Sequence, residues 1–250
     1  MLGAVVALGL ALSGCGGGTG GAAPATTSAS SARDALGGAS VPSTTPSRST
    51  AGASTRRSVP ATSVPVPATR KPASVHYTFP VTPQAHATFV HAHHDYPATD
   101  IMARCGDDYR AVVDGVVTGV SSVDQWRPSA NDGATRGGLS VTFLGVDGVR
   151  YYGSHLRAVA AGVRVGARVT SGQVIGLVGN SGDARGMHCH VHFGLSKVCR
   201  SGNDWWLRRG EVYPWPYLES WRKGGQRNPA AAVTAWVHRN GCPAHPLVDP

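Results

Sequence analysis

The stretch GMHCHVHFG, residues 186–194, decides the fold and carries the densest set of chemically active side chains. In a β-strand, side chains two positions apart point to the same face of the sheet. We predict a strand over Met187–Leu195, with its three histidines on one face and the residues between them facing the core. Three imidazoles on one side of a strand are costly to bury unpaired, so they suit a metal ion or the groups around it. The histidines are His188, His190 and His192, and the core-facing residues are Cys189, Val191 and Phe193.

Short valine-rich segments separated by Gly or Asp-Gly surround this strand. Leu139–Leu144 and Val149–Leu156, joined by a turn at Val146-Asp147-Gly148, are typical of a β-hairpin. Glycines recur across Val163–Val178, where each would weaken a helix by ~1 kcal/mol, so short turning strands are favoured. Residues 111–117, AVVDGVV, indicate a strand, a turn and a second strand. The sequence therefore predicts a mainly β fold, a small antiparallel β-sheet or barrel-like sandwich with Gly-rich hairpins.

Two short C-terminal helices are predicted to follow. The first spans Pro216–Lys223 and ends at a pair of glycines. The second has Asn228 as its N-cap and Pro229 as its first residue, and it runs to a stop at Gly241.

The composition differs sharply between the N-terminal part of the chain and the remainder. Residues 16–75 are mostly Ser, Thr, Ala, Pro, Gly and Arg, whereas every Trp, Tyr and Phe lies at Tyr77 or later. A segment of the first kind cannot bury enough apolar surface to offset the entropy of ordering it, so we expect a disordered tether. We assign residues 76–200 to one folded domain and residues 201–250 to a C-terminal helical extension.

Residues 1–15 indicate export. Met1–Gly14 is apolar but far shorter than the ~20 residues that a membrane-spanning helix needs, so it is interpreted as a secretory signal. Leu12-Ser13-Gly14-Cys15 resembles the signal of bacterial lipoproteins, in which the cysteine becomes the lipidated N-terminus after cleavage. No Lys or Arg precedes the apolar run, which departs from that pattern. The resemblance implies an extracytoplasmic protein, anchored to the cell membrane through lipid on Cys15 and facing the cell wall.

Charge and motif content exclude several functions. The net charge is +9, although charged residues make up only 15% of the chain. A basic surface suits nucleic acid, anionic lipid or an anionic wall polymer, but no aromatic-basic module for nucleic acid is present. Glu211 and Glu219, the only glutamates, lie far from any histidine cluster, which excludes an H-E-x-x-H metalloprotease. The absence of G-x-x-x-x-G-K-[ST] excludes a P-loop.

Two further clusters add candidate ligands. The segment VRYYGSHL, residues 149–156, places Tyr151, Gly153 and His155 on one face by strand alternation. The other cluster supplies imidazoles and carboxylates close together in the sequence, and both are good Zn²⁺ ligands. Its members are His91, His93, His94, Asp95 and Asp100.

The order of these features resembles the lysostaphin/LytM-type zinc metalloendopeptidases, which cut the peptide part of peptidoglycan. The likeness covers residues 91–196. Its most specific stretch is VTSGQVIGLVGNSG, residues 169–182, which is similar to that family's V-x-x-G-Q-x-I-G-x-V-G-N-[ST]-G segment. Asp100-Ile101, followed by Val113-Asp114-Gly115-Val116-Val117, is similar to its D-I … A-x-x-D-G-x-V segment.

The resemblance implies a site with one zinc ion and two further histidines. His94, Asp100 and His192 look like the zinc ligands, while His155 and His190 look like the catalytic histidines that do not bind the metal. Of these two, His190 is the better placed general base. His155 would stabilise the oxyanion or protonate the leaving amine.

The spacing of the first two ligands departs from the family pattern. The family commonly has H-x-x-x-D, whereas Tyr96 stands at that ligand position here. The loop between His94 and Asp100 must bulge to bring both groups to one ion, and His93 is the alternative ligand. Gly194 stands where many relatives have Glu, which we expect to affect the strand rather than the chemistry.

The implied function is hydrolysis of peptidoglycan stem or cross-bridge peptides by an exported zinc metalloendopeptidase. One alternative is a catalytically inactive relative that binds or regulates cell-wall hydrolases. A second is a lipoprotein that delivers zinc through the His-rich residues 86–94. Anionic wall polymers are a further partner class that the positive charge suits.

The sequence leaves open how the cysteines pair and what the C-terminal aromatic residues do. Export favours disulfides, and Cys189 has candidate partners in Cys105 and Cys199, so the pairing stays open. The fourth cysteine outside the signal is Cys242. Trp205-Trp206 and the aromatic residues of 213–217 are interpreted as packing for the C-terminal helices, with a substrate-binding platform as the alternative.

Overall fold

The computed structural model describes residues 74–199 and 204–247, which form two antiparallel sheets and a few short helices. The predicted signal of residues 1–15, and the predicted tether up to residue 73, lie outside the described residues. The strands are β1 (Val81–Thr82), β2 (Thr99–Met102), β3 (Asp108–Arg110), β4 (Gly115–Ser121), β5 (Leu139–Gly145), β6 (Arg150–Leu156), β7 (Ala158–Val159), β8 (Arg168–Val169), β9 (Val174–Leu177) and β10 (His190–Ser196). The helices are the 3₁₀ turns η1 (Gln84–His86) and η2 (Gly182–Ala184), and α1 (Trp205–Arg208), α2 (Trp215–Arg222) and α3 (Ala230–Asn240).

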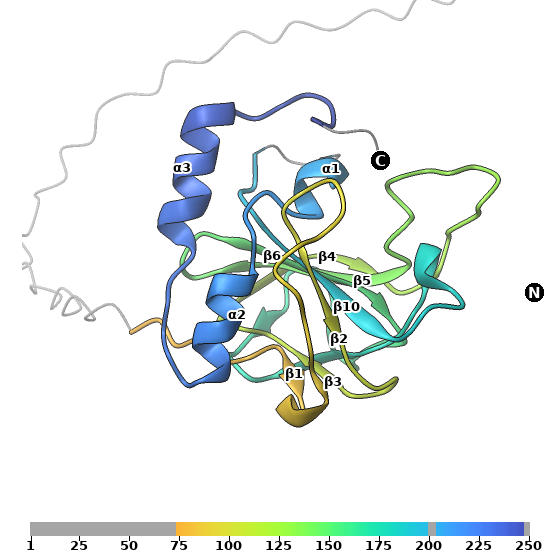
Figure 1. Ribbon diagram of the computed structural model, residues 1–250, viewed down its shortest axis with the longest axis horizontal. Coiled ribbons are helices and arrows are strands. Elements are labelled where there is room, and N and C mark those ends of the chain that lie inside the picture. The colour runs from red at the N-terminus through yellow and green to blue at the C-terminus, as the bar shows by residue number, and fades with distance from the viewer. Residues whose placement is uncertain (1–73, 200–203, 248–250) are drawn as a thin grey trace, which may run out of the picture. The chain divides into compact units, whose positions relative to one another are not determined.

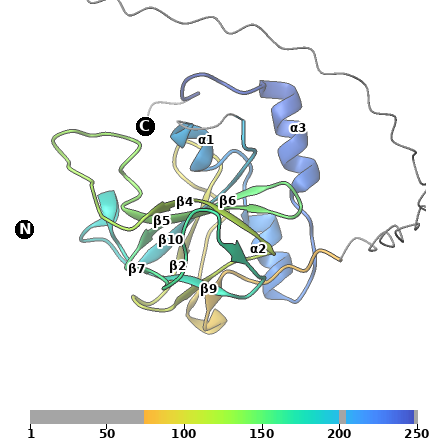
Figure 2. The ribbon, with the colours of Figure 1, turned by 180° about the vertical axis from the view of Figure 1, so that it is seen from behind.

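The mainly β prediction is confirmed. The smaller sheet has the strand order β1-β3-β9-β7, and the larger sheet has the order β2-β10-β6-β5-β4-β8. Figure 1 shows α2 and α3 on one side of the strands and the green loop between β4 and β5 extending from the opposite side. Figure 2 shows the same arrangement from behind.

The two sheets share one hydrophobic core. Tyr109 of β3 is fully buried, and its ring lies where a side chain at position 153 of β6 would be, so Gly153 permits this close approach. Cys189, Val191 and Phe193 all belong to the core, as the alternation of the histidine strand predicted. Burial of this apolar face fixes which side of β10 the histidines can occupy.

Local turn chemistry accounts for most strand boundaries. The predicted hairpin is confirmed, because β5 and β6 pair directly and Gly148 in their turn has a φ of 76°. In residues 111–117 the predicted second strand is confirmed, because Val116 and Val117 lie in β4. The predicted first strand is wrong, because residues 111–113 form no strand. Residues 111–113 are fully buried in the connection between the sheets, so their hydrophobicity reflects burial rather than strand pairing. β10 begins at His190, so His188 lies before the strand and is exposed.

Both predicted C-terminal helices are confirmed. At the start of α3, Asn228 Oδ1 accepts a hydrogen bond of 2.8 Å from the backbone N–H of Ala230. The helix ends at Gly241, whose φ is 66°. Trp221 of α2 stacks on Tyr77, with ring centroids 5.2 Å apart. The single turn α1 was not predicted, because its 4 residues are too few to show a helical period.

Two disulfides resolve the cysteine pairing. Cys105–Cys189 joins the β2–β3 connection to the residue before β10, and Cys199–Cys242 joins the end of the β10 segment to the residues after α3. The division between a domain of residues 76–200 and an extension of residues 201–250 stays a prediction. Within the described residues, no helix has both the length and the apolar character needed to cross a membrane.

Candidate active site

Three neighbouring strands of the larger sheet bring the candidate residues together. β10 lies between β2 and β6, so His192 stands opposite Asp100 on one side and Ser154 on the other. His190 precedes His192 by two positions on the same face of β10, and His155 follows Ser154 in β6. The antiparallel register therefore joins side chains that are 92 positions apart in the sequence.

His93, Asp100 and His192 form a group that could hold a metal ion. One ligand atom from each lies within 4.8 Å of the others. Asp100 Oδ1 is 3.0 Å from His192 Nδ1 and 3.7 Å from His93 Nε2. His93, the alternative ligand of the sequence analysis, therefore stands in this group where His94 was predicted. His94 is exposed; it lines the same pocket, and its ring centroid lies 4.9 Å from that of His93.

The loop before β2 accounts for this exchange. Residues 94–97 form consecutive bends, so the chain changes direction repeatedly before β2 begins at Thr99. The ring centroid of Tyr96 lies 4.6 Å from His93 and 5.7 Å from His192, beside the group rather than within it. The Tyr96 carbonyl accepts a hydrogen bond of 3.2 Å from His93 Nδ1, which orients the His93 ring.

Backbone carbonyls set the tautomers of both histidines. A carbonyl oxygen can only accept, so His93 Nδ1 donates to Tyr96, and His192 Nε2 donates to the Arg209 carbonyl at 2.8 Å. His192 Nδ1 is also within hydrogen-bond distance of Asp100 Oδ1, at 3.0 Å, and His93 Nε2 faces the same carboxylate. A proton or a metal ion must lie between these nitrogens and the carboxylate, because bare lone pairs and a carboxylate repel one another. Two imidazoles and a carboxylate are also a known donor set of catalytic zinc, so these residues fit that ion.

The protonation of the group also suits a metal ion. Burial, with the charge of His192, lowers the pKa of His93 to about 4, so this ring is neutral at neutral pH. Burial works to raise the pKa of Asp100, but the hydrogen bond and charge of His192, with His93 nearby, hold that pKa well below its usual range. Neutral imidazole and ionised carboxylate are the forms in which these side chains bind metals.

His155 and His190 lie next to the metal-ligand group. Their ring centroids are 4.9 Å apart, and that of His155 is 6.0 Å from His192. His155 Nδ1 donates to the Ser181 carbonyl and His190 Nδ1 donates to the His188 carbonyl, each at 2.9 Å. Each neutral ring therefore keeps a lone pair on Nε2 for a proton. Burial, with His192 and His190 nearby, lowers the pKa of His155 to about 3.

The face on which His155 lies differs from the prediction. Tyr151 is buried in the core and Gly153 packs against the other sheet, whereas Tyr152 and Ser154 line the pocket together with His155. His155 has a φ of 61°, in the left-handed region, which breaks the period of the strand and turns its side chain toward the site. Because the residue with this left-handed φ is not a glycine, the sequence does not indicate where the strand alternation is interrupted.

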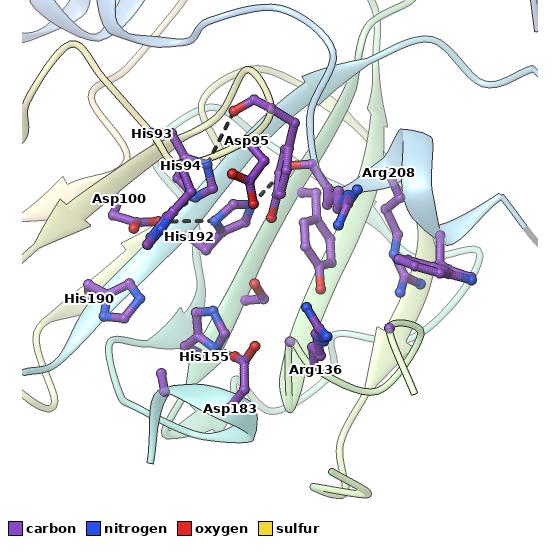
Figure 3. A pocket seen from close by; sticks show the side chains of 18 of the residues that line it. His93, His94, Asp95, Asp100, Arg136, His155, Asp183, His190, His192 and Arg208 are labelled. Atoms are coloured by element: carbon purple, nitrogen blue, oxygen red, sulfur yellow. Dashed lines mark hydrogen bonds and ion pairs between the residues drawn. The ribbon is translucent and has the colours of Figure 1, made fainter. Parts of the chain in front are cut away.

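These side chains line a pocket of about 280 Å³. Figure 3 shows the candidate zinc ligands on one side of it and Arg136 and Arg208 on the other. Trp205 also lines the pocket, and its ring packs against Gly133 and Trp206. Alternation along β6 could have indicated Tyr152 and Ser154, but an arginine in a loop or a single helical turn looks like any solvated charge. The wall residues that sequence reasoning missed are Arg136, Tyr152, Ser154, Asp183, Arg208 and Arg209.

The other histidines of the N-terminal cluster lie elsewhere. His91 Nε2 is 2.8 Å from Glu219 Oε1 of α2, and its ring stacks on Trp215 with centroids 3.9 Å apart. His86 Nδ1 is 3.0 Å from Asp107 Oδ2. Of the His-rich residues 86–94, His93 and His94 line the pocket, whereas His86 and His91 are each paired with a carboxylate.

Comparison with known proteins gives a family match and a curated relative. Residues 94–204 match the model of Peptidase family M23. The L-Ala--D-Glu endopeptidase of Bacillus subtilis (strain 168) is 29% identical over 135 residues, which are 51% of this chain and 36% of that protein. The chain thus spans about a third of the length of the curated relative that it matches.

Solved structures show a more distant likeness. A structure from Ruminococcus gnavus that carries the name lytM is 20% identical with a TM-score of 0.47, over 60% of this chain and 62% of that chain. The catalytic domain of the antimicrobial peptidase lysostaphin from Staphylococcus simulans is 21% identical with a TM-score of 0.41, over 54% of this chain and 95% of that one. The family match and the curated relative show that the central part of this chain is similar to peptidases.

Proposed function

We propose that this protein is an exported zinc metalloendopeptidase that hydrolyses peptide bonds of peptidoglycan. The family match over residues 94–204 and the endopeptidase relative support the peptidase activity. The chain covers only 36% of that relative, so the substrate is part of the proposal rather than carried over from it.

The orientation of two histidine rings is the observation that carries the proposal. His93 and His192 each donate one N–H to a backbone carbonyl and turn the other nitrogen toward Asp100. We assign these three residues as the ligands of one zinc ion, with His93 in the role that the sequence pattern gave to His94. Three protein ligands leave a fourth position for water or substrate, which distinguishes catalytic from structural zinc sites.

The two neighbouring histidines complete the chemistry. Bound zinc supplies Lewis-acid polarisation of a carbonyl and lowers the pKa of its water to about 7. His190 and His155 each keep an Nε2 lone pair, so each can accept a proton. His190 is the better placed base, because it shares a strand face with His192. We assign to His155 the return of the proton to the leaving amine or the stabilisation of the oxyanion.

We further propose that the protein acts outside the cytoplasm, held at the membrane by lipid on Cys15. The support comes from the sequence, namely the lipoprotein-type residues 12–15 and the composition of residues 16–75. A flexible tether of about 60 residues has a reach of roughly 40–50 Å, which lets the domain sample the wall close to the membrane. The net charge of +9 suits contact with anionic wall polymers, and no role in binding nucleic acid is proposed.

The two rival functions are less favoured. An inactive regulator would have no need of a metal-ligand group and two further histidines around one pocket. A zinc-delivery protein would need several accessible ligands in the His-rich residues 86–94, but His86 and His91 are each engaged by a carboxylate.

Digestion of purified peptidoglycans by the full chain, with and without a chelator, tests the proposal when the released fragments are analysed by mass. We expect peptides with new N-termini, loss of this release with the chelator, and recovery on addition of zinc. An inactive regulator releases no peptide under any of these conditions. Release that continues at full rate after the metal has been removed contradicts the assignment to zinc.

A further inference from the structure

Three arginines form one wall of the pocket. Arg136 comes from the loop between β4 and β5, Arg208 ends α1, and Arg209 follows it. Figure 3 shows Arg136 and Arg208 on the side of the pocket away from Asp100. We call these three residues the arginine wall. No step of the proposed hydrolysis uses these cations, so the wall needs a role of its own.

Aromatic rings hold two of the guanidinium groups in place. Arg208 Cζ lies 5.0 Å from the ring centroid of Tyr152, and Arg209 Cζ lies 4.0 Å from that of Tyr96. A guanidinium that stacks on a ring uses its flat face, so its N–H groups point outward in the plane of the group. Tyr152 is only 4% exposed, so the platform under Arg208 is fixed. A cation positioned in advance loses little conformational freedom when a ligand binds.

The two segments that carry the wall contact each other directly. Arg208 Nη2 donates to the Ala134 carbonyl at 3.4 Å. Gly133 lies so close to the ring of Trp205 that any side chain at this position would overlap it. The β4–β5 loop and α1 therefore form a continuous surface beside the catalytic histidines.

Neutral oxygen atoms, rather than carboxylates, accept the hydrogen bonds of Arg136 and Arg208. In residues 74–199 and 204–247, no carboxylate lies within 4.0 Å of the nitrogens of Arg136 or Arg208. Their hydrogen bonds go to an amide oxygen and a backbone carbonyl, and the Nε of each is buried without a hydrogen-bond partner. Asp95 and Asp183 also line the pocket. Asp183 Oδ1 is 3.8 Å from His155 Nδ1, and burial raises the pKa of Asp183 although the charge of Arg136 acts to lower it.

We propose that the arginine wall is a carboxylate-binding subsite, and that the substrate is an acidic peptide whose carboxylate lies close to the bond that is cleaved. This inference rests on the proposed peptidase function and adds the chemical class of its substrate. Guanidinium groups bind carboxylates through paired, charge-assisted hydrogen bonds. A substrate whose carboxylate has been converted to a primary amide has no negative charge there and one hydrogen-bond acceptor fewer. Because Arg208 and Arg209 lie at the end of α1, the part of the chain that follows β10 would take part in substrate recognition.

Matched substrates test this subsite. Purified peptidoglycan with free peptide carboxylates is compared with the same material after their conversion to primary amides. The full chain is used as wild type, Arg136→Gln and Arg208→Gln, with exposed Arg164→Gln as a control of equal charge. We expect the wild type and the control to cleave the carboxylate form at least about tenfold faster. The two wall variants should bring this ratio toward one. An unchanged ratio in both wall variants overturns the proposal.

Binding separates failure of the subsite from failure of the proposed function. Soluble stem peptides, as carboxylates or as amides, are titrated into the zinc-loaded full chain by calorimetry. A preference for the carboxylate of about tenfold in Kd, lost in Arg208→Gln and kept in Arg164→Gln, supports the subsite even if no bond is cleaved. Equal binding and equal cleavage of both forms overturn the subsite while the peptidase function stands. Zinc content and far-ultraviolet circular dichroism verify that each variant is folded.

Discussion

His192 stands directly opposite Asp100 in the antiparallel pair of β10 and β2, with 3.0 Å between Nδ1 and Oδ1. A slip of one residue would turn His192 into the core and bring Val191 or Phe193 into the pocket. Both of these apolar residues are fully buried, so the core holds the register. The geometry of the metal-ligand group is therefore a consequence of how the apolar face of β10 packs.

Replacing His155 with alanine is expected to retain zinc and to lower turnover about 10²–10⁴-fold. The reason is that its ring lies beside the metal-ligand group, with its centroid 6.0 Å from that of His192. Zinc content and the rate on purified peptidoglycan are measured on the same preparation. His188→Ala is the matched control, because this exposed side chain lies before the strand and both properties should survive. Loss of zinc from His155→Ala would make His155 a ligand instead.

Replacing Asp204 with asparagine is expected to lower the free energy of unfolding by about 3–5 kcal/mol. Arg150 Nη1 donates to both Asp204 oxygens, at 2.7 and 2.8 Å, and the two side chains are only 5% and 10% exposed. The substitution leaves the Arg150 cation buried without its partner, just before α1. Urea denaturation measures the change. Replacing both residues with apolar ones of similar volume should recover much of the loss, whereas an unchanged midpoint for Asp204→Asn would refute the argument.

Glu211 should make stability fall as the pH rises. Burial raises the pKa of Glu211 from 4.5 to about 8, although Arg209 and Arg150 act to lower it. Between these values the folded chain keeps a proton that the unfolded chain has lost, so stability falls through that window. Glu211→Gln cannot titrate, so this fall in stability with rising pH is absent from the variant. At fixed zinc, the stability of the variant relative to the wild type should rise from pH 4.5 to about 8 and then level off.

This comparison isolates Glu211 from the histidines. His93 and His155 have lowered pKa values, so they are neutral in the folded chain and contribute the opposite slope at lower pH. Their contribution is the same in the variant and the wild type, and it cancels in the difference. A difference that stays flat across the whole range would show that the Glu211 carboxyl titrates normally.

Removing the Cys105–Cys189 disulfide, by serine at both positions, is expected to cost about 2–5 kcal/mol of stability and to reduce turnover. The bond closes a sequence separation of 84 residues, and Cys189 directly precedes His190. The Cys199–Cys242 bond, with a separation of 43 residues, is the matched comparison. Its removal should reduce stability with a smaller effect on the rate. Equal rates in the two double variants would argue against a link between the first disulfide and His190.

The regular parts of the fold could be predicted from the sequence because they rest on local rules. Alternation along β10 gave the face of its histidines, and turn residues such as Gly148 and Gly241 gave the ends of elements. The pairing of residues 111–113 could not be predicted in this way. Their hydrophobicity is equally compatible with a strand and with a buried connection between sheets.

The finer choices at the site depend on the tertiary structure. His93 and His94 are chemically identical neighbours, and the bends of residues 94–97 decide which of them faces Asp100. The carbonyls that fix the histidine tautomers belong to the backbone, so no residue type marks them. The arginine wall comes from two segments with no shared pattern, and it exists only because the β4–β5 loop and α1 meet.

The zinc content of three forms of the chain tests the central claim most directly. The wild type, His93→Ala and His94→Ala are dialysed against a mild chelator, and the zinc retained per chain is measured. We predict about one ion in the wild type and in His94→Ala, and much less in His93→Ala, because only His93 turns a buried lone pair toward Asp100. Zinc retained in full by His93→Ala and lost from His94→Ala would contradict the account.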